Sequence, residues 1–205
     1  KIRVGDCATN LAYDRGAMFT YTLEQTGTDF VGMIINGNGS QEAGADGKFD
    51  IDAYKNWGLR LSQAVGGRLS IGGFYYSGAE KNQAAALKND ITYWGPDLSL
   101  DLGKINITAQ YLERTDSDPF FSSGPEIKTQ GTIAEVIFLP RLDKSRFYFT
   151  GLYNRISSDL PSLDYETATL SGSYLLARNL RLIVEYTRDL QYEANRLVVG
   201  TVGGF

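Results

Sequence analysis

Two residue types that carry much of enzyme chemistry are scarce in this chain. It contains no histidine and a single cysteine, Cys7. A Ser-His-Asp triad, a zinc site with histidine ligands and a CxxCH haem attachment are therefore excluded within it, as are an internal disulfide and a cysteine-cage metal site. Cys7 would lack a histidine base, so we interpret it as a small apolar residue and not as a nucleophile. The sequence predicts no catalytic residue, no enzyme activity and no cofactor.

Acidic residues in two segments offer the oxygen ligands that calcium prefers. These segments are residues 46–52 (DGKFDID) and 116–118 (DSD). Neither follows the ligand spacing of an EF-hand loop. Acidic loops of this kind are usually hydrated surface, so we expect no bound metal.

Length alone allows one large domain or two small ones, and we expect a single domain over residues 1–205, with residues 1–14 poorly assigned. Apolar residues make up 42% of the chain and aromatic residues 12%, while 20 bases against 24 acids give a net charge of -4. That charge gives no electrostatic reason to expect a nucleic-acid partner. The longest stretch without a charged residue, residues 30–41, has 12 residues, whereas a membrane-spanning helix needs about 20. No apolar stretch of a signal peptide follows residues 1–6, so we expect a processed or truncated chain.

A period of two residues in hydrophobicity recurs along the chain and predicts β-strands. In residues 179–188, one side carries Leu180, Leu182, Val184 and Tyr186, and the other carries Arg181, Ile183, Glu185 and Thr187. The same alternation is found in residues 17–23, 57–61, 69–75, 98–102, 105–111, 146–154 and 166–176. Helical spacing explains none of these segments, because residues two apart fall on different faces of a helix.

The connections between these segments alternate between short and long. Short turns are expected at residues 26–28, 66–67, 103–104, 142–145 and 178–179. Longer polar loops are expected at residues 37–53, 78–89, 115–128, 157–164 and 189–194. A Greek-key sandwich has no reason for this alternation, whereas an up-and-down barrel has all tight turns on one rim. The fold class predicted is an all-β, antiparallel, up-and-down transmembrane β-barrel.

The strand count leaves two alternatives for the start of the chain. Eleven strands can be placed between about Arg15 and Phe205. Residues 1–10 would supply a twelfth strand and the even number usual for such barrels. Alternatively, Lys1 lies inside a larger barrel, of which this chain is the C-terminal part.

The arrangement of aromatic residues favours lipid around the apolar side of the strands. Four tyrosines lie on the apolar side at the long-loop end, namely Tyr75, Tyr111, Tyr153 and Tyr186. A ring of tyrosines at one height is typical of a membrane interface, where the hydroxyl meets water and the ring meets acyl chains. Phe147 and Phe205 are expected to form a second girdle at the short-turn rim. The alternative is a soluble β-barrel with the apolar side turned inward.

The opposite side of the strands is polar but sparsely charged, as expected of a water-filled or plugged lumen. The residues predicted to line the pore are Arg60, Asp101, Gln110, Glu135, Arg181 and Glu185. Their mixed signs predict weak selectivity, because selective pores use rings of like charge. A lumen arginine near a glutamate is more often a solvated cross-strand pair than a selectivity element.

The last strand, residues 197–205, resembles that of bacterial outer-membrane β-barrels of the porin type. Such proteins end in a strand with alternating apolar residues and a terminal phenylalanine, a pattern matched by Leu197, Val199 and Phe205, with weaker residues at Thr201 and Gly203. The resemblance implies a signal-cleaved precursor in the bacterial outer membrane. It also implies insertion by the barrel-assembly machinery through the C-terminal strand, and a monomer or homo-oligomer.

Three functions remain compatible with these features. The first is a porin-like channel for passive diffusion of small solutes or ions. The second is a barrel that sheathes a partner, such as a multihaem cytochrome in an electron conduit. Such a sleeve needs no haem motif of its own. The third is a soluble β-barrel binding protein.

Overall fold

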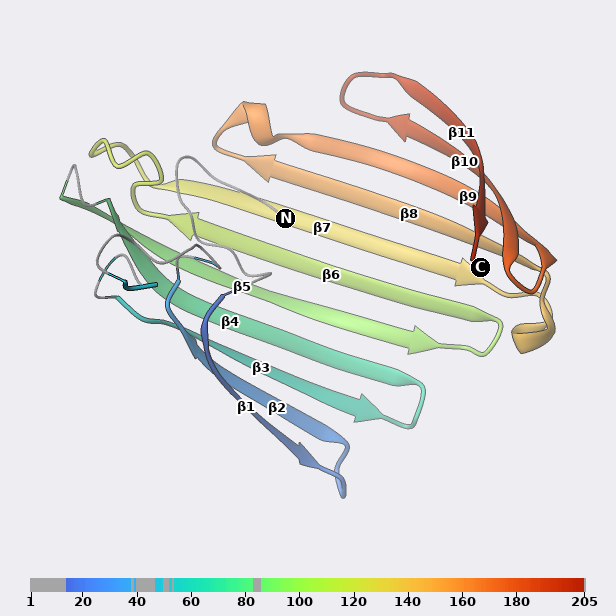
Figure 1. Cartoon of the computed structure of the whole chain (residues 1–205), viewed down its shortest axis with the longest axis horizontal. Coiled ribbons are helices and arrows are strands. Elements are labelled where there is room, and N and C mark those ends of the chain that lie inside the picture. The colour runs from blue at the N-terminus through green and yellow to red at the C-terminus, as the bar shows by residue number, and fades with distance from the viewer. Residues whose placement is uncertain are drawn as a thin grey trace. The chain divides into compact units, whose positions relative to one another are not determined.

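The computed structural model describes residues 14–37, 39, 47–49, 52, 54–82 and 86–204. These residues form eleven β-strands in a single antiparallel sheet, in which each strand pairs with its neighbours in the sequence (Figure 1). The strands are β1 (Gly16–Leu23), β2 (Thr28–Ile35), β3 (Asn56–Val65), β4 (Leu69–Asn82), β5 (Leu87–Asp101), β6 (Ile105–Asp116), β7 (Ile127–Phe138), β8 (Phe147–Ser158), β9 (Tyr165–Ala177), β10 (Leu180–Asp189) and β11 (Asn195–Gly203). The predicted eleven-stranded, up-and-down arrangement is confirmed.

Two 3-10 helices interrupt the connections, η1 (Leu142–Lys144) and η2 (Pro161–Leu163). At three residues each, they fall far below the length that a helical membrane span requires, and the described chain has no other helix. The possible twelfth strand in residues 1–10, Cys7 and Phe205 lie outside the described residues.

The short turns have the local chemistry that tight hairpins require. Gly66 and Gly67, between β3 and β4, have φ angles of 61° and 69°. Two consecutive residues with positive φ are the mark of a hairpin turn whose twist matches that of the strands, and glycine adopts this conformation without a steric penalty. Gly103, between β5 and β6, has a φ of 77° and donates its N–H to the carboxylate of Asp101 at 2.7 Å.

One predicted loop is wrong in its boundaries. Residues 78–89 were expected to form a long loop, but β4 continues to Asn82 and β5 begins at Leu87. The alternation of apolar and polar residues is lost there because polar side chains are buried as well as apolar ones. Ala79, Glu80 and Asn89 are all less than 9% exposed. At 14 and 15 residues, β4 and β5 are consequently the longest strands of the described sheet.

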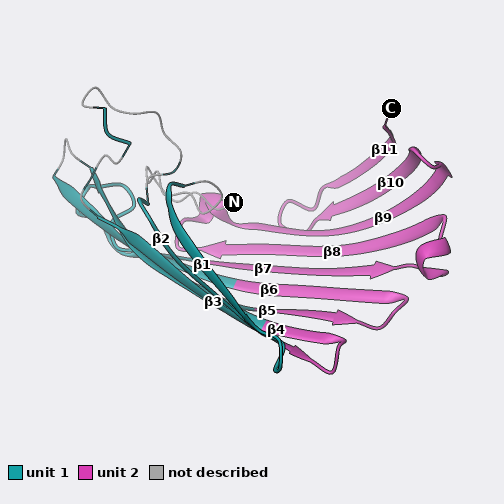
Figure 2. Ribbon diagram, turned by 60° about the horizontal axis from the view of Figure 1, so that its bottom comes forward, with its two compact units in different colours: residues 1–63, 72–96, 112–129 teal, residues 64–71, 97–111, 130–205 magenta. Residues whose placement is uncertain are grey.

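The chain divides into two compact units (Figure 2). Unit 1 comprises residues 1–63, 72–96 and 112–129, and unit 2 comprises residues 64–71, 97–111 and 130–205. The prediction of one domain over residues 1–205 stays a prediction.

Unit 1 has one face of exposed apolar side chains, called here the apolar face of unit 1. Tyr21 on β1 lies opposite Phe30 on β2, and Phe30 in turn lies opposite Leu61 on β3. Four residues along β2 from Phe30, Ile34 lies opposite Trp57. All five side chains are exposed. Side chains two apart in a strand share a face, so the register joins them into one continuous surface.

Unit 2 has a corresponding surface, called here the apolar face of unit 2. Tyr174 on β9 lies opposite both Phe147 on β8 and Leu182 on β10. Two residues along β10 from Leu182, Val184 lies opposite Val199 on β11. The Phe147 and Tyr174 ring centroids are 4.5 Å apart, and Phe138 stacks on Phe149 at 6.4 Å. The exposed members of this face include Phe138, Phe147, Phe149, Leu170, Leu176, Val184, Tyr186, Leu197 and Val199.

Buried side chains lie on the opposite face and are few. The hydrophobic cluster consists of Tyr76, Ile91 and Tyr93 in unit 1, with Met33, Ile35, Phe74 and Leu112 packed against it. The sheet therefore exposes most of its large apolar side chains and buries mainly polar ones, the reverse of the usual distribution in a water-soluble protein.

Candidate functional site on the face opposite the apolar side chains

In unit 2, hydroxyl groups line the face opposite the apolar side chains, called here the polar face of unit 2. Thr169 on β9 and Thr187 on β10 share a hydrogen bond of 2.9 Å between their hydroxyls. Thr150 on β8 lies opposite Ser171, and Tyr148 lies opposite Ser173. These small polar groups alternate with the apolar residues because successive side chains of a strand point to opposite faces.

Arg181 and Glu185 on the polar face of unit 2 contact neighbouring side chains. The guanidinium of Arg181 lies over the ring of Tyr148, 5.0 Å from its centroid. The carboxylate of Glu185 accepts from Nη2 of Arg196 on β11 at 3.4 Å, with side chains 34% and 70% exposed. The Glu185–Arg196 pair is the solvated cross-strand type, which contributes little to stability.

The six residues predicted to line a pore all lie on the strand sides opposite the apolar residues. Arg60 on β3 lies opposite Val31, and its neighbours Leu59 and Leu61 belong to the apolar face of unit 1. Gln110 shares its side of β6 with Arg114, and Glu135 lies on the side of β7 opposite Phe138. Arg181 and Glu185 share one side of β10 but bind Tyr148 and Arg196 instead of each other.

Asp101, the sixth of these residues, ends β5 and holds the following turn through the N–H of Gly103. Its carboxylate thus has a local structural role. Its exposure at the short-turn end nevertheless leaves it in contact with solvent.

In unit 1, the face opposite the apolar side chains carries a buried polar cluster that the sequence analysis did not find. Arg114 and Asp116 are 1% and 0% exposed, and the Nη2 of Arg114 donates to Asp116 at 2.6 Å. Arg114 also donates to the hydroxyl of Tyr93, and Asn89 donates to Asp116 at 2.9 Å. Burial of a charge requires a partner of opposite charge and hydrogen bonds, and Arg114 has both.

The sequence does contain a signal for this ion pair. Arg114 and Asp116 are two residues apart in a strand, which places them on the same side. The sequence does not reveal that the residues around this pair are buried.

Asn56 joins β3 to β4 within unit 1 and is fully buried. Its Nδ2 donates to the hydroxyl of Tyr76 at 2.7 Å, and its Oδ1 accepts from the N–H of Ala79 at 2.9 Å. Tyr76 packs edge-on against Tyr93, 5.6 Å between centroids. The Asn56 amide therefore connects β3 to the part of β4 that lies near the long loops.

Asp118 organises the connection between β6 and β7. Its carboxylate accepts from the backbone N–H groups of Ser122 at 3.0 Å and Ser123 at 2.8 Å. The hydrogen bond from Ser122, followed by that from Ser123, lowers the pKa of Asp118 below its ordinary value, because these bonds favour the charged carboxylate. Asp118 and its loop are further joined to β5 through the Oδ1 of Asn89, which accepts from the N–H of Asp118 at 2.9 Å.

Two of the acidic residues considered as calcium ligands, Asp116 and Asp118, contact other groups of the chain. Asp116 is committed to Arg114 and Asn89, and Asp118 to the backbone of its own loop. Within the described ranges, no group of three or more acidic, cysteine or histidine side chains is arranged to hold a metal ion. Asp46 and Asp50 lie outside the described residues.

Five of the aromatic residues predicted for the membrane interfaces lie on the apolar sides of their strands. The hydroxyl of Tyr153 donates to Glu166 at 2.8 Å, and that of Tyr186 donates to Asn195 at 2.8 Å. Tyr111 is half-buried on the side of β6 opposite Gln110, and Phe147 packs on Tyr174. The ring of Tyr75 lies 5.3 Å from that of Trp57. Phe205 lies outside the described residues.

Two tryptophans belong with the aromatic residues of unit 1, although the sequence analysis did not assign them to an interface. Trp57 contacts Tyr75, and Trp94 donates its Nε1–H to Glu113 at 3.4 Å. An indole with its ring exposed and its N–H satisfied is typical of an interface between an apolar and a polar environment.

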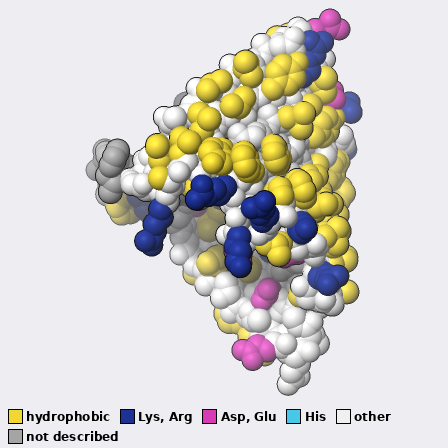
Figure 3. Space-filling model, turned by 90° about the vertical axis from the view of Figure 1, so that its right-hand side faces the viewer, with side chains coloured by type: hydrophobic (Ala, Val, Ile, Leu, Met, Phe, Trp, Pro, Cys, Tyr) yellow, Lys and Arg dark blue, Asp and Glu magenta, His cyan; other side chains and the backbone are white. Residues whose placement is uncertain are grey.

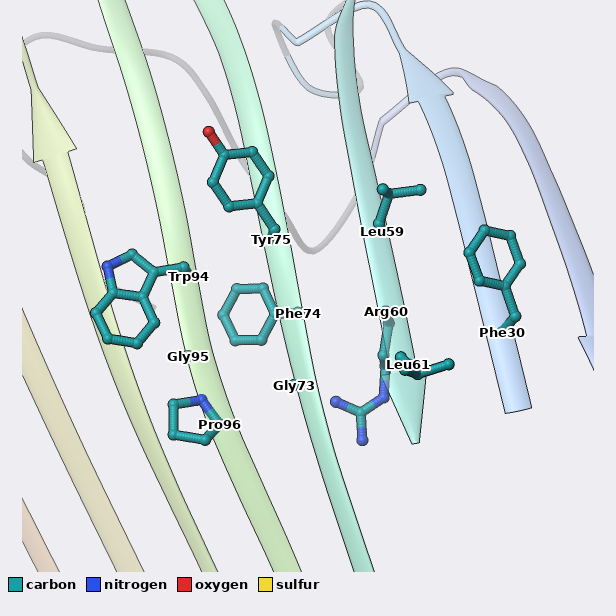
Figure 4. Close-up of a pocket in the computed structure, with 10 residues that line it drawn as sticks. All are labelled: Phe30, Leu59, Arg60, Leu61, Gly73, Phe74, Tyr75, Trp94, Gly95 and Pro96. Carbon is teal, nitrogen blue, oxygen red and sulfur yellow. The ribbon is translucent and has the colours of Figure 1, made fainter. Parts of the chain in front are cut away.

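The apolar face of unit 1 has a shallow hollow of about 500 Å³, and Figure 4 draws its lining residues. Residues from β2, β3, β4 and β5 line it, and they are Phe30, Leu59, Arg60, Leu61, Gly73, Phe74, Tyr75, Trp94, Gly95 and Pro96. Because almost all of these are apolar or glycine, the hollow offers no acid, base or nucleophile in a chemical arrangement.

Comparison with known proteins gives one informative result. Neither protein families nor curated protein sequences yield a match to this chain. Among solved structures, a porin refined at 1.8 Å matches with a TM-score of 0.68 and 13% sequence identity. The match covers 94% of this chain and 62% of the porin, so the chain spans less than two thirds of the length of that protein. The described chain therefore has a porin-type fold of antiparallel, up-and-down β-strands.

Proposed function

We propose that this chain forms the wall of an outer-membrane channel through which small solutes or ions diffuse passively. The observation that carries the proposal is the exposure of the large apolar side chains on one face of each unit, in unbroken register from strand to strand. Apolar surface of this extent is unfavourable in water, whereas hydrocarbon covers it at no cost. The porin-type fold supports the same location.

The strand lengths support a membrane span as well. A tilted strand crosses a bilayer in about 9–11 residues, and β3 and β10 have 10 residues each. The extra residues of β4 and β5 lie beyond Tyr75 and Trp94, on the long-loop side, and include the buried Tyr76, Asn89 and Ile91. We assign this extension to a rigid rim of the channel outside the hydrocarbon.

Arg60, Asp101, Gln110, Glu135, Arg181 and Glu185 would face the water-filled side of the channel. Their charges are of mixed sign, and Glu185 is partly neutralised by Arg196. A channel with such a wall discriminates weakly between anions and cations, since no ring of like charge is present among these residues. Tyr75, Tyr111, Tyr153, Tyr186, Phe147 and Phe205 would mark its two interfaces with the lipid headgroups. No enzyme activity is included in this proposal.

Conductance measurement tests the function. The purified chain would be refolded in detergent and added to a planar lipid bilayer, with its insertion checked separately by flotation with vesicles after a urea wash. The proposal predicts stable, ohmic steps with an anion-to-cation permeability ratio within a few-fold of one. Inserted protein that passes no current, and that co-purifies with a partner from a native membrane, would contradict the channel in favour of a sleeve.

A further inference from the structure

The short turns of unit 2 carry unpaired positive charge. Six bases lie on or beside these turns, and they are Arg68, Lys104, Arg141, Lys144, Arg146 and Arg178. All six are exposed, and among the residues that the structure describes none of them forms an ion pair. Only Asp101 and Asp143 oppose them on the same turns. We call these six bases the basic rim of unit 2.

Backbone hydrogen bonds anchor three of the rim residues to neighbouring strand ends. The carbonyl of Arg68 accepts from the N–H of Asp101 at 2.8 Å, and that of Lys104 accepts from the N–H of Leu139 at 2.8 Å. The carbonyl of Arg146 accepts from the N–H of Leu175 at 2.7 Å. The backbones of these three basic residues are thereby fixed to the ends of neighbouring strands. Figure 3 shows the side of the molecule on which these turns lie, with Lys and Arg side chains gathered and few acids among them.

The basic rim is positively charged, whereas the whole chain has a net negative charge. The chain has 20 bases and 24 acids, so the residues outside the rim and its two acids comprise 14 bases and 22 acids. Turns joined across two strands lie about 10 Å apart, which is close to the screening length at physiological salt. Like charges at this spacing reinforce one another and attract anions.

Apolar side chains border the basic rim directly. Arg146 precedes Phe147, Arg141 precedes Leu142, and Lys104 follows Leu102 by two residues. Phe147, Leu142 and Leu102 are about half exposed. Figure 3 shows hydrophobic side chains next to the basic ones. A ligand that fits this border has an anionic group beside a hydrocarbon chain, which describes a phospholipid better than an acidic protein.

We propose that the basic rim of unit 2 binds the headgroups of anionic phospholipids in the membrane leaflet that the short turns face. This inference rests on the proposed function, because it requires the apolar face of unit 2 to contact lipid. The cations attract the headgroup phosphate by charge, while the aromatic and aliphatic side chains beside them contact the acyl chains. The expected preference is about fivefold over a zwitterionic lipid, falling as salt is raised.

Spin-labelled lipids provide the test. The chain would be reconstituted in phosphatidylcholine vesicles with traces of labelled phosphatidylglycerol or phosphatidylcholine, and the motionally restricted fraction of each label measured by electron paramagnetic resonance. Wild type is expected to restrict the anionic label about fivefold more strongly. The variant R68Q/K104Q/R146Q is expected to restrict both labels equally. The control K55Q/R155Q/R188Q loses three bases outside the rim and is expected to keep the preference.

The outcomes separate this inference from the proposed function. If neither label is restricted, the chain does not contact lipid and both proposals fail. If both labels are restricted equally in wild type, the apolar face contacts lipid but the lipid site is overturned. A third outcome is that wild type restricts both labels equally and also binds immobilised polyglutamate in a salt-sensitive manner. The basic rim would then bind an acidic protein, and the proposal would likewise be overturned. Unchanged circular dichroism in each variant excludes misfolding as the cause.

Discussion

Val199 on β11 lies directly opposite Val184 on β10, and the two side chains are 64% and 42% exposed. Cross-strand valine pairs usually lie in a core, where burial of both side chains stabilises the sheet. Here the pair continues the row formed by Tyr174 and Leu182, also on the apolar face of unit 2. The proposed hydrocarbon environment would account for this exposed valine pair.

Replacing Val199 by arginine tests this explanation against a matched neighbour. Val198 precedes it, is 44% exposed and lies opposite Glu185 on the polar face of unit 2. We expect Val199→Arg to cost about 2–4 kcal/mol of folding free energy in phospholipid vesicles, because a guanidinium would enter the hydrocarbon. Val198→Arg should change stability by less than about 1 kcal/mol, since an exposed pair with Glu185 is worth little. Urea titration in vesicles measures both. Equal effects would contradict the assignment of the two faces.

Removing one partner of the buried ion pair in unit 1 should be strongly destabilising. Asp116→Asn removes the carboxylate that pairs with the buried guanidinium of Arg114, at a cost of about 3–5 kcal/mol. The exposed Glu185–Arg196 pair provides the control, because Glu185→Gln should cost less than about 1 kcal/mol. Both values come from urea unfolding followed by tryptophan fluorescence. A small effect of Asp116→Asn would show that water reaches the pair.

The crowded contact between Gly78 and Asn56 predicts a steric effect. A Cβ atom on Gly78 would lie 2.1 Å from the Cγ of Asn56, whose amide is fixed by Tyr76 and Ala79. We expect Gly78→Ala to destabilise the chain by about 1–3 kcal/mol through overpacking. Gly200 on β11 has open space around the corresponding position, so Gly200→Ala should be close to neutral. The comparison fails if the two substitutions shift the urea midpoint equally.

Acid should weaken the connection between β6 and β7. The pKa of Asp118 is lowered in the folded state by the N–H groups of Ser122 and Ser123. The stability that this carboxylate contributes is therefore fully present above its unfolded pKa of about 3.9, and is lost as the pH falls through the lower folded value. We expect Asp118→Asn to be less stable than wild type at pH 7 and to lose less stability between pH 5 and pH 2. Parallel curves for the two proteins over that range would refute this role of Asp118.

Much of the fold follows from the sequence because β-strands with different environments on their two sides alternate in a period of two residues. The alternation at residues 179–188 fixes both the existence of β10 and the side on which Val184 lies, and the paired registers agree with it. Short glycine-containing turns such as Gly66-Gly67 set the hairpins through local conformation alone. These are local properties, so one sequence suffices to predict them.

The features that the sequence did not reveal depend on contacts between distant residues. The parts of β4 and β5 near the long loops lose the alternation of apolar and polar residues because Glu80 and Asn89 are buried together with Ala79. Whether a polar group is buried depends on its tertiary partners. The Arg114–Asp116 pair is recognisable by its spacing, but its burial depends on Tyr93 and Asn89 from β5. Trp57 reaches Tyr75 only once β3 and β4 are side by side.

Quenching of tryptophan fluorescence tests the central claim most directly. The chain has only two tryptophans, and Trp57 and Trp94 are 42% and 43% exposed on the apolar face of unit 1. In vesicles of lipids brominated along the acyl chains, we expect most of the emission to be quenched, while aqueous iodide leaves it nearly unchanged. Strong quenching by iodide together with no effect of the brominated lipids would place this face in water and contradict the account.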